Sequence, residues 1–464
     1  PINTGDPRDA TIMTLSSLLV QLKVPGEYKE LSETSEIELV TRLQVWKNDT
    51  LRILQELNTR IEQSTDLSLD EQADIVAAVA PLDGDSEWTE LPSQELAQNI
   101  LHRFMDPPLT LVTHILQNNI RPLFRSNPHP EMNAETGRKL ARSAGGPNAS
   151  QDFFESQHWK DHPGAARTIL WCVENIPTEA YDQVWHLVIP PLMILLDDYE
   201  ARYKLEGVRI ASEMLKRVPG SLLKRTGVDG LLSVSFQKAL TSFDRPQTRE
   251  LIPTTVYVSL ALIEETTSIG SVQRFDQLSA LLGDGIIASI WPYASDKLDA
   301  LVASVDALPP IFEALGVGCA RYLKVLIAQL VYPLNPSGYR SSSVELQIVS
   351  LRALATLITA CAERMEHWKG TILAAVARCW VSLVESGTPD DPSETSGCFQ
   401  NSRPLTDLED DRNCKMYAKH WLLRLPRSPG CDLLLSPTRD VDPIFQDYAR
   451  LQELDTMFED MLVR

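Results

Sequence analysis

Two histidines lie four residues apart in the segment His-Trp-Lys-Asp-His that spans 158–162. On a helix this spacing points both imidazoles the same way, as in a zinc site. Zinc also needs at least one further ligand and a helical frame, whereas Pro163 and Gly164 follow at once and favour a loop. We therefore expect His158 and His162 to be solvent-facing or hydrogen-bonded. The alternative is a metal-dependent hydrolase that uses both histidines and nearby carboxylates.

Asp197 and Asp198 form an adjacent carboxylate pair that could serve acid–base chemistry. Neighbouring residues on a helix point about 100° apart, so these two side chains do not converge on one atom. Their position before a helical segment favours N-terminal capping of that segment instead.

The sequence carries no recognisable set of catalytic residues. It has no GxSxG nucleophile elbow, and Gly316-Val-Gly-Cys319 lacks the Lys-Ser/Thr pair that follows the glycines of a phosphate loop. We expect a protein that is not an enzyme and that uses neither a cofactor nor a metal.

The most distinctive stretch covers residues 121–140, with the sequence Arg-Pro-Leu-Phe-Arg-Ser-Asn-Pro-His-Pro near its start and Thr-Gly-Arg-Lys-Leu at its end. Its prolines fix their own φ angles and push the preceding residues out of the helical region, so a rigid turn is predicted. The stretch is either a loop pinned against the helices that follow or a contact surface for a partner or an anion. The residues concerned are Arg121, Phe124, Arg125, Asn127, His129, Thr136, Gly137, Arg138 and Lys139. For the cations among them we favour pairing with acidic residues of those helices over a partner surface.

The composition suits helices and a protein partner. Of 464 residues 43% are hydrophobic but only 7% aromatic, which favours helix packing over sheets. The formal charge of −20 argues against nucleic acid and against an anionic membrane surface. The longest apolar run, Leu187–Leu196, is too short to span a bilayer, and no signal sequence precedes it. Seven cysteines without CxxC spacing indicate a reducing compartment.

Helical periodicity predicts an all-α protein. Apolar residues recur at steps of three and four in Ile37–Ile61, and further helices are predicted over Ala165–Glu174 and Tyr181–Leu196. The predicted organisation is an N-terminal helical region (1–120), a Pro/Gly-rich connection (121–164), a HEAT-like helical array (165–386), a flexible acidic and polar loop (387–411) and C-terminal capping helices (412–464). Stacked helix pairs would form an α-solenoid, an α-α superhelix with one long concave surface.

The connection, together with the tryptophans, prolines and aspartates that follow it, resembles the Tti-two (Tel-two-interacting protein two) family over roughly residues 110–230. The residues of the helical part that carry the resemblance, which we expect to pack the array, are Trp159, Trp171, Trp185, Pro190, Asp197 and Asp198. The resemblance implies a non-catalytic α-solenoid, the smaller scaffold of the TTT (Tel-two/Tti-one/Tti-two) cochaperone complex.

That resemblance also implies partners. They are Tti-one as direct and obligate partner, Tel-two with it, and the HSP-ninety and R-two-T-P chaperone machinery. Phosphatidylinositol-3-kinase-related kinases such as TOR, ATM and ATR would be indirect clients, and the location would be cytoplasmic and nuclear. The alternative is another HEAT-type adaptor, such as a transport or phosphatase scaffold. We expect the C-terminal array to hold more of the Tti-one interface than residues 1–110.

Overall fold

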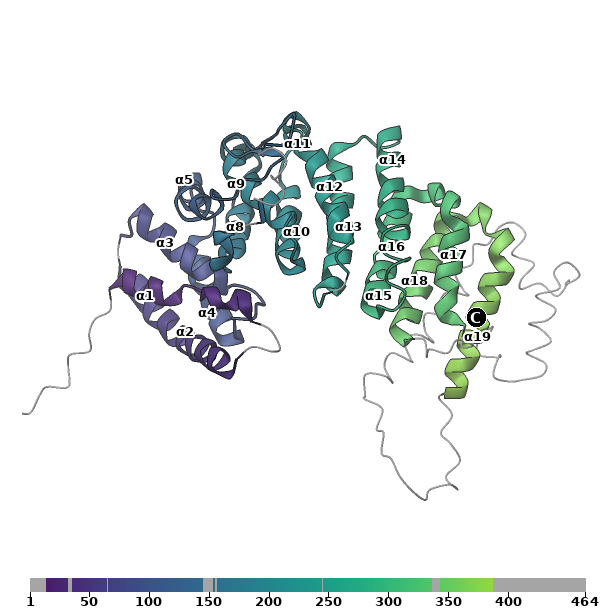
Figure 1. Ribbon diagram of the computed structural model, residues 1–464, viewed down its shortest axis with the longest axis horizontal. Coiled ribbons are helices and arrows are strands. Elements are labelled where there is room, and N and C mark those ends of the chain that lie inside the picture. The colour runs from purple at the N-terminus through teal and green to yellow at the C-terminus, as the bar shows by residue number, and fades with distance from the viewer. Residues whose placement is uncertain are drawn as a thin grey trace, which may run out of the picture. The chain divides into compact units, whose positions relative to one another are not determined.

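The computed structural model describes residues 14–31, 36–64, 66–144, 153–154, 157–243, 245–335 and 343–386. Helices dominate this part of the chain (Figure 1), which confirms the all-α prediction. Contacts divide the chain into two compact units, Pro1–Phe236 and Gln237–Arg464. The predicted connection 121–164 is therefore not a boundary between units but lies inside the first one. The loop predicted over 387–411 and the capping helices predicted over 412–464 lie outside the described residues.

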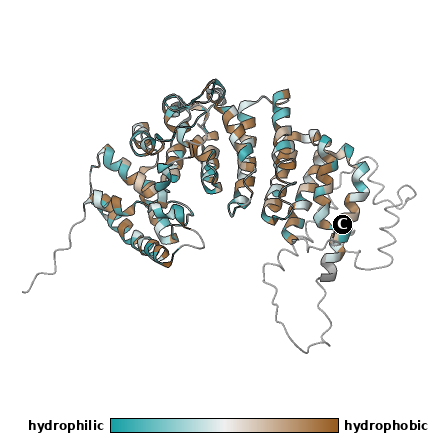
Figure 2. Ribbon diagram, in the orientation of Figure 1, coloured by the Kyte–Doolittle hydropathy of each residue, from teal (hydrophilic) through white to brown (hydrophobic). Residues whose placement is uncertain are grey.

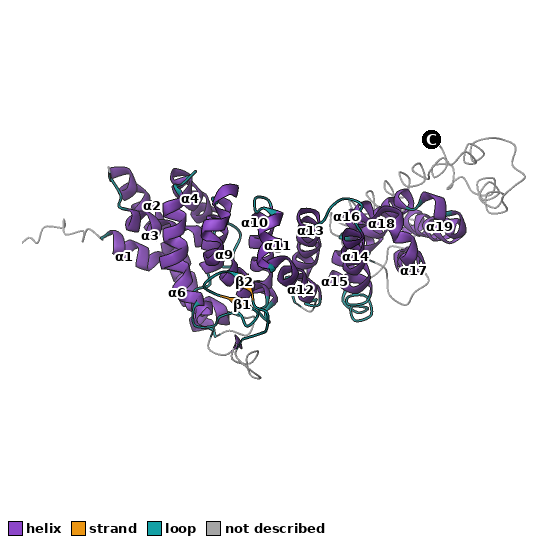
Figure 3. Ribbon diagram, turned by 90° about the horizontal axis from the view of Figure 1, so that it is seen from above, coloured by secondary structure: helices purple, strands orange, loops and turns teal. Residues whose placement is uncertain are grey.

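The first unit consists of helices and one short antiparallel strand pair, visible in Figure 3. Its elements are α1 (Leu15–Leu22), α2 (Ile37–Gln63), α3 (Leu69–Val79), α4 (Leu91–Leu101), α5 (Leu109–His114), α6 (Arg121–Phe124), β1 (Met132–Asn133), β2 (Arg138–Lys139), α8 (Ala165–Glu174), α9 (Tyr181–Leu196), α10 (Ala201–Leu215), α11 (Gly220–Thr226) and most of α12 (Val228–Leu240). The observed bounds of α8 and α9 are those predicted from the sequence.

Helices α8, α9 and α10 pack against one another and form the centre of this unit. Helix α9 is buried along most of its length, and both of its prolines lie inside the helix. It approaches α10 closely at Gly207, where an added Cβ would lie 2.9 Å from the backbone nitrogen of Leu196. The glycine thus sets how near the two helices can come.

The N-terminal helices belong to the same core. Helix α3 begins with a capping box between Ser68 and Glu71, and it packs against α8. The 3-10 turn Gly26–Glu30 contacts the turn His158–Asp161. There the Nζ of Lys29 lies 2.5 Å from Oδ1 of Asp161. Residues before 110 are therefore part of the unit that contains the predicted connection.

In its described residues, the second unit contains α13 (Thr248–Thr266), α14 (Val272–Ala280), α15 (Leu298–Asp306), α16 (Leu308–Leu315), α17 (Leu323–Val331), α18 (Val344–Ala360) and α19 (Lys369–Ser386). Helix α15 packs against α13 on one side and against α18 on the other. One apolar core runs through the unit from Leu240 to Trp380. Figure 2 shows apolar and polar residues interleaved along these helices, as expected where each buries one face against its neighbours.

One segment in the described part of the chain, Leu298–Leu334, is long and apolar enough by composition to cross a membrane. This segment is longer than Leu187–Leu196, the longest apolar run considered in the sequence. The structure divides it into α15, α16, α17 and two 3-10 turns, and 56% of its most apolar window is buried. Buried core helices pass the same compositional test, so this segment is accounted for by the core of the second unit.

Two glycine substitutions should change stability in opposite directions. Gly207→Ala forces a methyl group into the contact between α9 and α10, so we expect it to lower the free energy of unfolding by about 1–3 kcal/mol. Gly230→Ala, on α12, meets only the Nζ of Lys139 at 4.0 Å. It should raise stability by about 0.5–1 kcal/mol, because alanine favours the helix. Chemical denaturation of both variants checks this, and equal effects would contradict the close approach.

Candidate partner-binding site

The distinctive segment begins inside a helix. Helix α5 continues through a π-helical turn, Ile115–Ile120, directly into α6. One helical run therefore extends from Leu109 to Phe124. The ring of Phe124 is buried and stacks on Trp159, with the centroids 5.4 Å apart. This stacking joins the end of α6 to the turn that precedes α8.

The proline-rich turn carries two buried polar side chains, Asn127 and His129. The backbone N–H of Glu131 donates to Nδ1 of His129 at 3.2 Å, so the proton of the neutral ring sits on Nε2. That nitrogen lies 3.3 Å from Oδ2 of Asp197, at the end of α9. The turn is thereby fixed to α9, as its rigid sequence predicts.

The β1–β2 hairpin follows, with Met132 paired to Lys139 and Asn133 to Arg138. The Asn133 side chain accepts backbone hydrogen bonds within the turn. Gly137 adopts the left-handed conformation, with φ of 62°. Its carbonyl accepts a 2.9 Å hydrogen bond from Nε1 of Trp185, and an added Cβ would lie 3.0 Å from Cδ1 of that ring. Only glycine suits this position, which seats the hairpin directly on α9.

A buried lysine ties the end of the segment to α10. The Nζ of Lys160 lies 3.0 Å from Oδ2 of Asp198 and 2.7 Å from Oε1 of Glu200. It also lies over the rings of Tyr199 and Tyr203, 4.1 and 4.9 Å from their centroids. Asp198 is fully buried and Lys160 nearly so. Because a buried charge without a partner is costly, each side of this cluster depends on the other.

The surroundings shift the pKa values of Asp198 and Glu200 in opposite directions. Burial raises the pKa of Asp198 above its ordinary value, although Lys160 and the backbone N–H of Glu200 act against this. Burial also acts to raise the pKa of Glu200, but Lys160 and Arg202 outweigh it and the pKa is lowered. Asp198 is therefore buried in surroundings that disfavour its charge, and Lys160 is one of the groups that act against this.

The predicted capping role of the two aspartates is wrong. Glu200 is the N-cap residue of α10, and no side chain caps that helix end. Asp198 instead accepts from the backbone N–H of Glu200 at 2.8 Å and pairs with Lys160, while Asp197 faces His129. The two carboxylates diverge, as their adjacent positions imply, and each holds one part of the preceding segment.

The cations of the segment differ from the favoured prediction of internal pairing. Arg121 forms an ion pair with Glu135, within the segment itself. Arg125, Arg138 and Lys139 are exposed and form no ion pair with any described residue. Thr136 is exposed as well. Internal pairing is thus wrong for Arg138 and Lys139, the two cations at the second strand of the hairpin.

The two histidines do not share a helical face. His158 lies in a 3-10 turn with its side chain 73% exposed and Nδ1 3.7 Å from Oδ2 of Asp161. His162 follows that turn, and burial and the charge of Lys23 lower its pKa. Within the described ranges, no group of three or more His, Cys, Asp or Glu residues could hold a metal ion.

The predicted packing residues lie in the first unit. Trp159, Trp171 and Trp185 are buried, and Pro190 is half-buried inside α9. Sequence reasoning gave no role to Lys160, Glu200 or Tyr203. The sequence feature that could have indicated this cluster is a lysine next to Trp159, in a segment predicted to be a loop. The Asp197-Asp198 pair was a possible partner for that lysine.

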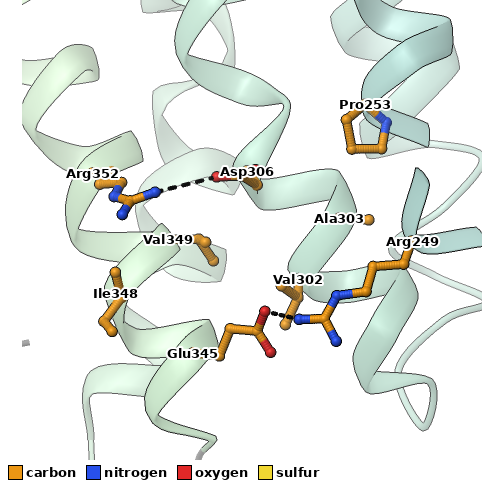
Figure 4. Close-up of a pocket in the computed structure, with 9 residues that line it drawn as sticks. All are labelled: Arg249, Pro253, Val302, Ala303, Asp306, Glu345, Ile348, Val349 and Arg352. Atoms are coloured by element: carbon orange, nitrogen blue, oxygen red, sulfur yellow. Dashed lines mark ion pairs between the residues drawn. The ribbon is translucent and has the colours of Figure 1, made fainter. Parts of the chain in front are cut away.

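A hollow lies in the second unit, between α13, α15 and α18, with a volume of about 310 Å³ (Figure 4). Arg249 pairs with Glu345 and, at 3.5 Å, with Asp299, while Arg352 lies 3.8 Å from Asp306. These side chains are about half exposed, so each pair contributes at most about 1 kcal/mol. Cations and anions alternate on its walls, which favours neither an anionic nor a cationic ligand.

These features define an all-helical protein whose first unit carries a hairpin loop fastened by buried polar and aromatic contacts. The sequence model of the Tti2 family matches residues 75–337, more than half of the chain. The chain therefore belongs to the Tti2 family, which confirms the resemblance seen in the sequence. The matched range contains the whole loop and the Lys160 cluster. No solved structure matches the chain.

Replacing Lys160 should destabilise the first unit strongly. Lys160→Met leaves Asp198 buried without its cation, and we expect a loss of about 3–5 kcal/mol at neutral pH. The loss should shrink as the pH falls, because an acid whose folded-state pKa is raised destabilises the fold only where it is ionised. Denaturant unfolding at several pH values measures this.

Two further variants complete the experiment. Adding Asp198→Asn to Lys160→Met should recover part of the loss, because the buried charge is gone. Lys216→Met, which breaks an exposed pair with Glu213, should cost less than about 1 kcal/mol. A loss for Lys160→Met no larger than that for Lys216→Met would show that the buried cluster does not hold the loop.

Proposed function

We propose that this chain is a non-catalytic scaffold subunit of the TTT cochaperone complex. Membership of the Tti2 family is the observation that carries the proposal. In this role the chain binds Tti-one directly and Tel-two with it. The complex acts with HSP-ninety and the R-two-T-P cochaperone to mature and stabilise kinases such as TOR, ATM and ATR, in the cytoplasm and the nucleus.

The architecture of each unit supports a binding role. Helices adjacent in the sequence pack side by side in both units, for example α9 with α10 and α17 with α18. We propose that these are degenerate HEAT-like pairs. Such pairs present long helix faces on which another protein can lie, and scaffolding needs shape and fixed side chains more than proton transfer.

Exposed apolar side chains suggest where a large interface forms. In the second unit, Ile269 is 91% exposed and Val272 is 75% exposed, at the start of α14. In the first unit, Ile37 and Val40 on α2 are 85% and 46% exposed. We propose that the second unit holds more of the Tti-one interface than residues 1–110. Deleting residues 1–110 would not test this, because α3 packs against α8 inside the first unit.

The test is purification of the tagged chain from its native source. We expect Tti-one and Tel-two in near-stoichiometric amounts, and retained in high salt, because obligate interfaces are centred on apolar contacts. Recovery of a transport receptor or a phosphatase subunit in their place would identify another kind of adaptor and contradict the proposal.

A matched pair of variants locates the interface in the same experiment. Ile269→Asp with Val272→Asp should reduce capture of Tti-one, whereas Ile37→Asp with Val40→Asp should leave it unchanged. Both pairs add two charges to exposed apolar positions, so Tm serves as the control for folding. The reverse result would move the interface to the N-terminal helices.

A further inference from the structure

The hairpin presents two cations on a rigid support. Arg138 and Lys139 form strand β2, and both are exposed. The support beneath them is fixed by the Trp185 hydrogen bond to Gly137 and by the close fit of that glycine on α9. The stem of Lys139 runs beside Gly227, where an added Cβ would lie 3.2 Å from the Cβ of Lys139. The backbone that carries both cations and the stem of Lys139 are therefore in place before any ligand arrives.

Unpaired cations concentrate in this segment. Elsewhere in the first unit most arginines have partners, such as Arg42 with Glu27, Arg103 with Glu62, and others along the helices. Four exposed cations between residues 125 and 142 have no ion pair with a described residue. They are Arg125, Arg138, Lys139 and Arg142. In a chain of formal charge −20, such a cluster is where an incoming anionic group meets the least repulsion.

We propose that Arg138 and Lys139 are a docking point for an acidic segment of a protein partner, which deepens the scaffold function proposed above. The guanidinium of Arg138 and the ammonium of Lys139 are complementary in charge to a short run of Asp or Glu side chains. A nucleic acid fits less well, because its binding rests on neutralising many phosphates with Lys and Arg, and this chain carries a formal charge of −20.

The test uses the full chain and its captured Tti-one and Tel-two assembly. Arg138→Glu with Lys139→Glu should leave Tm unchanged and weaken assembly by about tenfold or more at low salt. The deficit should narrow as salt is raised, because salt screens the same attraction in the wild type. Arg138→Lys with Lys139→Arg keeps both charges and should assemble as the wild type does.

A charge-matched control separates a local effect from a change of net charge. Lys324 and Arg364, in the second unit, are exposed and form no ion pair with a described residue. Changing both to Glu alters the net charge equally and should leave assembly intact. Equal weakening by both double variants would overturn the docking point.

The remaining outcomes also decide. Normal assembly of the hairpin variant at normal Tm overturns the inference, and failure of the wild type to assemble overturns the proposed function instead. If the Glu double variant has a lowered Tm, the variant to test next is Arg138→Gln with Lys139→Gln. It removes both positive charges without adding negative ones. If that variant is stable and assembles normally, the inference is overturned. If the hairpin variant assembles normally but no longer binds a single-stranded RNA homopolymer that the wild type binds, the ligand of the two cations is a nucleic acid and not an acidic protein segment.

Discussion

The ammonium group of Lys160 is the contact on which the first unit depends. It joins the turn before α8 to Asp198 and Glu200, at the start of α10, and it lies over two tyrosine rings. On the other side of this turn, Trp159 stacks on Phe124 at the end of α6. A segment rich in proline and glycine has few regular backbone hydrogen bonds of its own. Its order therefore comes from a small number of buried side chains that reach the neighbouring helices.

In the hairpin, buried anchoring contacts and exposed charges are separate. Buried contacts with Trp185 and Asp197 hold the backbone of the loop, while its cations face solvent. A structural loop would be expected to neutralise its charges internally, since the surrounding chain is rich in carboxylates. The separation of buried anchors from unpaired charges is instead the arrangement of a surface built to be recognised.

The sequence predicted the regular parts of this fold well and the irregular part poorly. Helices α8 and α9 were placed to the residue, because apolar periodicity is bounded there by Pro-Gly and Ile-Pro signals. The segment 121–164 was predicted to be a connection, because it is largely polar and rich in proline and glycine. The few large side chains within it, Phe124 and Trp159 among them, are its anchors. Asp198 was misassigned because its partner is 38 residues away, beyond the reach of local pattern.

The turn Gly26–Glu30 has a consequence for how the protein is made. Lys29 is held by Asp161, 132 residues later, and its carbonyl accepts from Arg202, 173 residues later. Contacts between residues this far apart in the sequence stabilise the fold only once both partners have been synthesised, because the long loop between them must first be closed. During synthesis the first helices must therefore leave the ribosome and wait until α10 has emerged before they can complete their packing. For that interval their apolar faces are open to chaperones, so this subunit of a proposed chaperone assembly is itself a candidate for such help.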